Sequence, residues 1–218
     1  MFAGHIGAAL AIARAERRVN VGIFVVAALL LDLLLWVFVL LGWESVSIPA
    51  DFADTHQAEF VFPYSHGLLA SLIWSALAGI LGFAVYSTGR KNWRLAAFIA
   101  VAVLSHWVLD AFVHQPELVL VGSGSRLVGL GLWNNMPVAL MLEAVIVTGG
   151  LCLFIPAAGL ARPRSVTLVA LTVLAMVFTA VGMTAAPAPP SATAMAGGSL
   201  ATLTLVCAVA WWCGRRKR

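Results

Sequence analysis

Six ionisable side chains of the kinds that bind divalent metal ions stand inside apolar runs or at their edges: His5, Asp32, His66, His106, Asp110 and Glu143. A carboxylate near the centre of a bilayer costs at least a few kcal/mol, so it is normally paired, hydrated or bound to a metal. Neutral imidazoles and carboxylates are the ligands that zinc and related divalent ions take. Roughly one to three such ions in a water-accessible pocket would clamp a phosphoryl group and acidify a water molecule. These residue types therefore predict a divalent metal centre, with zinc as the expected ion.

The segment SHWVLDAFVH carries three candidates at regular spacing, because His106, Asp110 and His114 follow one another every four residues. Residues four apart lie on one face of a helix, so this imidazole and carboxylate can bind one ion or bridge two. The simpler interpretation is that His106 and Asp110 hydrogen-bond each other across one turn. His114 is followed by Gln115 and Pro116, and it is either a surface histidine or an acid that protonates a leaving group.

The expected depths of these groups in the membrane agree. With a rise of about 1.5 Å per helical residue, Asp32 and His106 lie roughly 18 Å above the inner boundary. His5 and Glu143 come out roughly 20 Å above it by the same rise. His66 falls nearer the outer boundary and joins the others only if its helix tilts or has an unwound end; otherwise it is an interfacial or helix-capping residue. Glu143 is a ligand or general base, or alternatively a polar contact between helices.

Length and composition define the elements that must position these groups. The chain has 218 residues, of which 62% are hydrophobic and 10% are charged. A soluble domain carries roughly 25% charged residues, so a soluble protein is excluded. We expect one all-α membrane domain over residues 1–218, a polytopic bundle of six transmembrane helices plus a short N-terminal membrane-embedded helix at 1–13. The expected spans are 21–43, 64–86, 93–114, 137–156, 165–185 and a last one between Gly198 and Arg215.

The basic residues are distributed to one side of these spans. Twelve of the thirteen Lys and Arg residues flank spans at one membrane face, and only Arg126 lies at the other. By the positive-inside rule, the first face and the C-terminus are cytoplasmic. The acidic segment 44–63, in which His56 is expected to be solvated, the link 115–135 and a flexible Pro-rich linker at 186–198 then face outward. Because topology explains the net charge of +4, the expected partner is the lipid bilayer and not nucleic acid.

Two residues of the outward-facing link are candidates for binding a substrate. Arg126 either meets a phosphate group or anchors the protein to lipid headgroups. Asn134 follows Trp133 in an interfacial turn, where it either faces the pocket or only closes the turn. The sequence contains no indication of an oligomeric state.

Four short motifs also carry a family resemblance. GHIGAAL, LLLDLLLW, PYSHGLLAS and LSHWVLDAF occur in the order and spacing of the YdjM-like family, bacterial inner-membrane proteins described as predicted membrane-bound metal-dependent hydrolases. The resemblance covers roughly residues 1–145, the metal-site half, and residues 165–218 add two further helices. The matching positions, which the resemblance implies are metal ligands, are His5, Asp32, His66, His106 and Asp110.

The order of these residues is also similar to that of the zinc-dependent phospholipase C group, which binds a small zinc cluster. YdjM-like members often carry further ligands after the first carboxylate and before the second histidine. This chain has Leu33 to Trp36 and then Phe62 and Pro63 at those places. The departure implies either fewer metal ions or ligands drawn from His114 and Glu143 instead.

We therefore expect a membrane-embedded metal-dependent hydrolase that opens toward the outer face and acts on a phosphoester of a lipid or a lipid-linked envelope substrate. Glu143 would be the base or an extra ligand, and His114 an acid. The alternative is an ion- or proton-coupled transporter that uses the same buried groups as a relay. Against a transporter, no span is clearly broken by internal Gly and Pro, and no half repeats the other. A third possibility is a scaffold whose polar groups only bind helices together.

Overall fold

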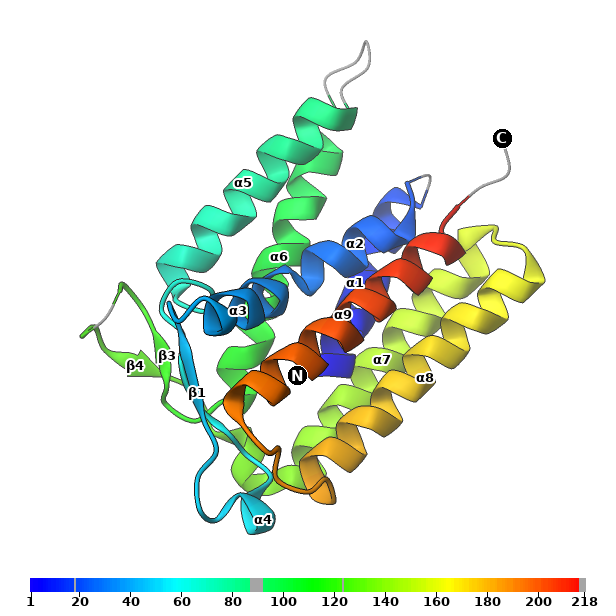
Figure 1. Ribbon diagram of the computed structural model, residues 1–218. Helices are drawn as coiled ribbons and strands as arrows, with labels where there is room; N and C mark the ends of the chain where they lie inside the picture. The colour runs from blue at the N-terminus through cyan, green and yellow to red at the C-terminus, as the bar shows by residue number, and fades with distance from the viewer. Residues whose placement is uncertain (18, 87–91, 123, 216–218) are drawn as a thin grey trace.

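The computed structural model describes residues 1–17, 19–86, 92–122 and 124–215 (Figure 1). Six of the thirteen basic residues used in the topology prediction lie outside this part: Arg18, Arg90, Lys91, Arg216, Lys217 and Arg218. The elements follow in the order α1 Phe2–Ala13, the 3₁₀ turn η1 Arg14–Glu16, α2 Val21–Ala28, α3 Leu30–Leu40, β1 Ser45–Ser47, α4 Phe52–Thr55, β2 Glu59–Val61, α5 Leu68–Tyr86, α6 Trp93–Val113, β3 Leu118–Val119, β4 Leu127–Val128, η2 Leu132–Asn135, α7 Met136–Ala158, α8 Arg162–Thr184 and α9 Ala192–Cys213.

The predicted class, an all-α polytopic bundle, is confirmed. Within the described residues, five helices are long and apolar enough to cross a membrane: α5, α6, α7 with η2, α8 and α9. The bent pair of α2 and α3 makes a sixth candidate span. Strands are confined to two short antiparallel pairs, β1 with β2 and β3 with β4, in the part of the chain that the structure describes. Ser45 lies opposite Val61 in the first pair and Leu118 opposite Val128 in the second.

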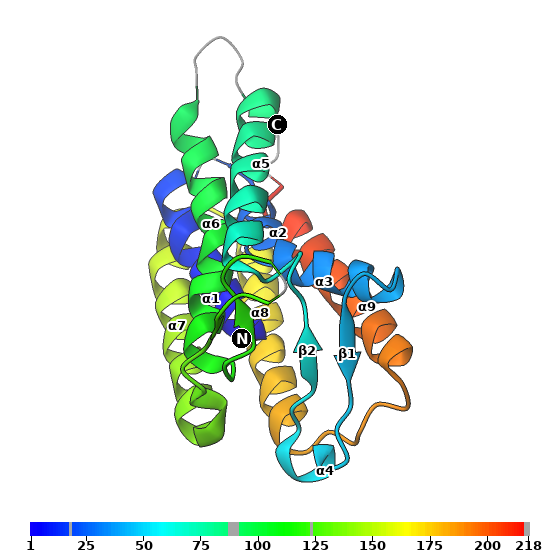
Figure 2. The same cartoon turned by 90° about the vertical axis from the view of Figure 1, so that its left-hand side faces the viewer.

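The short helix α1 lies inside the bundle and not on its surface (Figures 1 and 2). Eight of its twelve residues are buried. Two glycines allow this position, because α1 and α7 cross with their backbones in contact. A Cβ on Gly7 would come within 2.6 Å of the carbonyl oxygen of Ile146, and a Cβ on Gly150 would overlap the carbonyl oxygen of Gly7. The crossing brings His5 of α1 to the middle of the bundle, where it is 1% exposed.

The span predicted at 21–43 is not one straight helix. α2 and α3 are bent by 49° relative to each other at Leu29. In an unbroken helix the carbonyl of Ala28 would accept the N–H of Asp32. Here that carbonyl accepts Nδ1–H of His106, at 2.6 Å. As expected, no Gly or Pro lies at this bend; the break comes instead from the side chain of His106 inserted into the helical hydrogen-bond ladder.

Two further boundaries differ from the sequence prediction. The span expected from residue 64 becomes helical only at Leu68, because residues 64–67 turn toward the preceding segment. The flexible linker expected at 186–198 is shorter, since α9 begins at Ala192. The side chain of Ser191 accepts the N–H of Ala194 at 3.1 Å, which caps this helix.

Different contacts hold the chain segments together at each end of the bundle. At one end, Asn20 donates to the carbonyl of Trp211, and the guanidinium of Arg164 lies 5.6 Å from the ring of Trp212. At the other end, His56 bonds to the carbonyl of Ala186 at 3.0 Å. The described basic residues near α2, α8 and α9 therefore lie at the opposite end from the acidic segment with α4 (Figure 1).

Candidate metal centre

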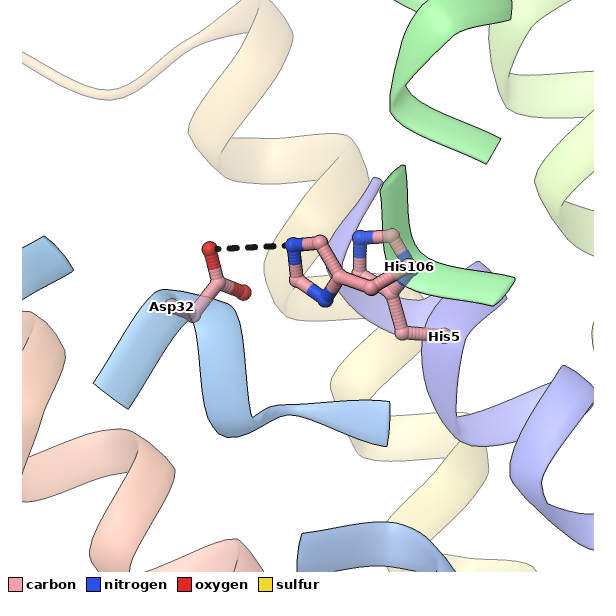
Figure 3. Close-up of side chains that lie close together, drawn as sticks. All are labelled: His5, Asp32 and His106. Carbon is pink, nitrogen blue, oxygen red and sulfur yellow. Dashed lines mark ion pairs between the residues drawn. The ribbon is translucent and has the colours of Figure 1, made fainter. Parts of the chain in front are cut away.

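The structure brings together all five residues predicted as metal ligands. They come from α1, α3, the turn before α5, and α6, and they are His5, Asp32, His66, His106 and Asp110. Four are buried, with at most 2% of the residue exposed, and the Asp32 side chain is 21% exposed. Figure 3 shows Asp32 pointing from α3 toward His106, behind which the ring of His5 is stacked. The unwound turn before α5 is what lets His66 reach the others, as the depth argument required.

Four of these side chains converge on one point. Nε2 of His106 lies 3.1 Å from Nε2 of His66, 3.1 Å from Oδ2 of Asp110 and 3.5 Å from Oδ1 of Asp32. Nε2 of His66 lies 3.6 Å from each of the same two oxygens. Ligands of a tetrahedral zinc ion, held at its usual bond lengths, are about 3.3 Å apart. Five of the six distances among these four atoms, at 3.1–3.6 Å, are therefore close to those between zinc ligands.

The protonation state of His106 follows from its other nitrogen. Nδ1 faces the carbonyl oxygen of Ala28 at 2.6 Å. Because a carbonyl only accepts, Nδ1 carries the proton, and whenever the ring is neutral its Nε2 presents a lone pair to the cluster. Metal-ligating histidines are oriented in this way by a carbonyl or carboxylate behind them. The bend at Leu29 thus supplies the carbonyl that orients His106.

His66 is oriented by a relay through a serine. Oγ of Ser65 donates to Oε2 of Glu44 at 2.7 Å and lies 2.8 Å from Nδ1 of His66. Since the hydroxyl proton is used on Glu44, the hydroxyl oxygen accepts the proton of Nδ1, and Nε2 of His66 is left with a lone pair. Oε1 of Glu44 accepts the backbone N–H groups of Tyr64 and Ser65, each at 2.8 Å. Burial raises the pKa of the Glu44 carboxyl, and its hydrogen bonds oppose that rise.

These two orientations leave four acceptors facing one another. Both imidazoles use their Nδ1 proton elsewhere, so the two Nε2 lone pairs meet at 3.1 Å beside two carboxylate oxygens. Such a buried group of acceptors is unfavourable unless a proton or a cation lies among them. The donor set fits a divalent ion that takes imidazole and carboxylate ligands.

Asp110 also faces a second group of side chains with its other oxygen. Oδ1 lies 3.2 Å from Nε2 of His5 and 3.1 Å from the amino group of Met1. The rings of His5 and His106 are stacked at 3.7 Å between centroids. One ligand atom each from His5, Asp32 and His106 lie within 4.8 Å of one another. Nδ1 of His5 is buried and has no hydrogen-bond partner among the described residues. Asp110 therefore lies between two neighbouring groups of possible metal ligands, and its two oxygens could each face one metal position.

The two residues predicted to be catalytic have different surroundings. Glu143 is buried on α7, and its Oε2 accepts the N–H of Gly4 in the first turn of α1 at 3.0 Å. His114 ends α6 with Nδ1 at 2.5 Å from Oε1 of Glu117 and Nε2 at 3.9 Å from Oδ2 of Asp110. His114 is thus an imidazole oriented by a carboxylate at the edge of the cluster, and it is buried and not at the surface.

The two predicted substrate-binding residues lie outside the cavity beside the cluster, as far as the described residues define it. That cavity has a volume of about 360 Å³ and is lined by Asp32, His66, Asp110, His114 and Glu143, among others. Arg126 is exposed just before β4 and does not line it. Asn134 exchanges hydrogen bonds with the side-chain amide of Gln115 and lines a neighbouring hollow. His56, expected to be solvated, is half-buried and lines both spaces.

Sequence reasoning missed the residues behind the ligands. Glu44 is one of four acids in the segment 44–63, and Ser65 belongs with His66 to the motif PYSHGLLAS. The one available signal was the serine directly before His66, but the partner of that serine depends on the turn at 64–67. Glu117, which orients His114, belonged to the link 115–135 and had no distinguishing pattern.

In comparisons with protein-family models, with curated proteins and with solved structures, nothing matches this chain.

Proposed function

We propose that this chain is a membrane-embedded metal-dependent hydrolase of phosphoesters, with zinc as the ion. The observation that carries the proposal is the set of four acceptor atoms from His66, His106, Asp110 and Asp32. Five of their six mutual distances are close to those between zinc ligands, and the Nδ1 proton of each imidazole is committed elsewhere. An ion held there would supply Lewis-acid stabilisation of phosphoryl oxygens. The resemblance of four motifs to the YdjM-like hydrolases supports the same reaction class.

Three side chains near the cluster would control substrate access, donate a proton and position α1. Asp32 is the ligand with the most exposed side chain, so substrate would reach the cluster past its carboxylate. His114 lines the same cavity and is held by Glu117, as a general acid must be held to protonate a leaving oxygen. Glu143 holds the N–H of Gly4 and would fix α1, and with it His5, beside Asp110.

The test measures metal content and turnover in one preparation. Detergent-purified protein is reconstituted with zinc, and the bound metal is measured by elemental analysis beside hydrolysis of a chromogenic phosphodiester. The variant Asp32→Asn keeps the shape of a partly exposed ligand, and Asp54→Asn on the exposed face of α4 is its matched control. We expect stoichiometric zinc and turnover in the parent and the control, and loss of both in Asp32→Asn. Zinc-free parent protein after reconstitution would refute the metal centre.

One observation favours a second candidate, an ion- or proton-coupled transporter. Discontinuous helices hold the substrate and ion sites of many secondary transporters, and Asp32 lies three residues after the break at Leu29. A proton in place of the metal among the four acceptors would serve such a relay. Proton-coupled flux in liposomes, without metal or turnover and abolished in Asp32→Asn, would establish the transporter in place of the hydrolase.

We also propose a bacterial inner membrane as the location, with the C-terminus in the cytoplasm. The excess of basic residues at one end supports this orientation through the positive-inside rule. A fluorescent protein fused to the C-terminus should then fold and fluoresce, while one inserted after Asp54 should not. The reverse pattern would invert the orientation.

A further inference from the structure

The cavity beside the metal-ligating cluster continues between the last two helices. Its wall includes Phe178 and Gly182 of α8 and Met195, Ser199 and Leu203 of α9. None of these side chains is ionisable, whereas Asp32, His66 and Asp110 line the same space. The cavity therefore has a polar part at the cluster and a largely apolar part formed by α8, α9 and the segment that joins them.

The apolar part also reaches the outer surface of the bundle. Phe178 lines the cavity although 58% of it is exposed, and its ring packs edge-on against Phe2 of α1 at 5.9 Å between centroids. In a protein that spans a bilayer, the exposed side of α8 faces hydrocarbon. Phe178 therefore stands at the boundary between the cavity and the surface of the bundle.

We propose that this apolar part holds the hydrocarbon chain of an amphiphilic substrate, whose phosphoester head lies against the cluster. The assignment rests on the proposed function for the head and on the α8–α9 wall for the chain. A small water-soluble ester would leave the wall formed by Phe178, Met195 and Leu203 without an apolar partner, whereas pockets of this kind bind ligands that cover their apolar lining. Two sources share the required chemistry, a diacyl phospholipid and a polyprenyl phosphate.

A glycine on the wall allows the apolar part of the cavity to be filled by a substitution that leaves the fold intact. An added Cβ on Gly182 meets no atom within 4 Å, so Gly182→Trp places its ring in open space, and any residue other than Pro improves on the helix propensity of glycine. Gly197 of α9 is the matched control, because an added Cβ there also meets no atom within 4 Å, and this exposed residue does not line the cavity.

The experiment is photolabelling in nanodiscs with two probes, a phosphatidic acid and a polyprenyl phosphate, each carrying a diazirine in its hydrocarbon chain. The protein is freed of metal with a chelator, so labelling does not depend on turnover, and labelled peptides are identified by mass spectrometry. Labelling of the exposed residues Leu174 and Leu205 reports contact with bulk lipid and serves as the internal reference.

We expect labelling of the peptides that carry Met183 and Met195 to saturate, and to be displaced by the unlabelled form of one probe, which identifies the source of the chain. That labelling should fall about tenfold relative to the reference in Gly182→Trp and stay unchanged in Gly197→Trp. Labelling that neither saturates nor responds to Gly182→Trp would overturn the proposal, even if the zinc-loaded protein hydrolyses a soluble phosphodiester. Saturable labelling in a protein that shows no hydrolysis would uphold the hydrocarbon-chain site. Only the proposed hydrolase reaction would then be refuted.

Discussion

Replacing Glu44 by glutamine should reverse the hydrogen-bond relay that orients His66. The backbone N–H groups of Tyr64 and Ser65 both point at Oε1 of Glu44, each at 2.8 Å, so the carbonyl oxygen of the new amide must take that place. The amide NH₂ then faces Oγ of Ser65 and donates to it. The serine proton turns to Nδ1 of His66, which moves the ring proton to Nε2, where the lone pair was.

The size of the effect follows from the role of such outer partners. Loss of a group that orients a metal-ligating histidine typically lowers metal affinity by about 10–100-fold. This corresponds to about 1.4–2.8 kcal/mol of binding free energy. The fold should persist, because glutamine has the shape of glutamate and keeps both backbone hydrogen bonds.

Two measurements test the reasoning on detergent-purified protein. Competition with a chromophoric chelator gives the zinc affinity, and nitrogen-15 spectra of the histidine-labelled, metal-free protein report which ring nitrogen carries the proton. The chain has five histidines, so the assignment is tractable. Glu59→Gln is the control, because Glu59 also accepts a serine hydroxyl, that of Ser47, but does so on the exposed strand pair. Unchanged affinity in Glu44→Gln, or His66 protonated at Nδ1 in that variant, would refute the relay.

Three other perturbations have defined outcomes. Gly150→Leu should prevent α1 from packing against α7 and sharply lower the thermal midpoint, whereas the neighbouring Gly149→Leu, whose Cβ meets nothing within 4 Å, should fold like the parent. His114→Gln should lower turnover by about 10²–10⁴-fold while zinc affinity, measured by competition, stays within a few fold of the parent. Asn20→Ala removes the cap of α2 and the bond to the carbonyl of Trp211, so denaturation should show a loss of about 1–2 kcal/mol; an unchanged midpoint would contradict the role of the cap.

The meeting of these side chains at one level of the bundle could be predicted because it depends mainly on helix rise. Asp32, His106 and His5 each lie a similar number of residues from a basic boundary, and the structure joins them. The broken helix could not be predicted in the same way. No glycine or proline marks Leu29, and the bend depends on His106 reaching the Ala28 carbonyl from 78 positions away.

The residues of the loops at the α4 end of the bundle were the least predictable part of the site. Arg126 and Asn134 were chosen for their residue types, and neither lines the cavity beside the cluster. Glu44 was overlooked because an acid in an outer loop is normally solvated. Its burial to 5% exposure depends on the turn at 64–67, a tertiary feature that hydrophobic periodicity does not encode.

The central position of α1 has a consequence for assembly. Gly4 meets Glu143 across 139 positions of sequence, and the crossing of Gly7 with Gly150 requires α7 to be in the membrane. With twelve residues, α1 is too short to cross a bilayer alone, so its final place exists only after most of the chain has been inserted. Contacts of such long range form late. His5 therefore joins Asp110 near the end of folding, and a partly inserted chain would hold the other ligands without it.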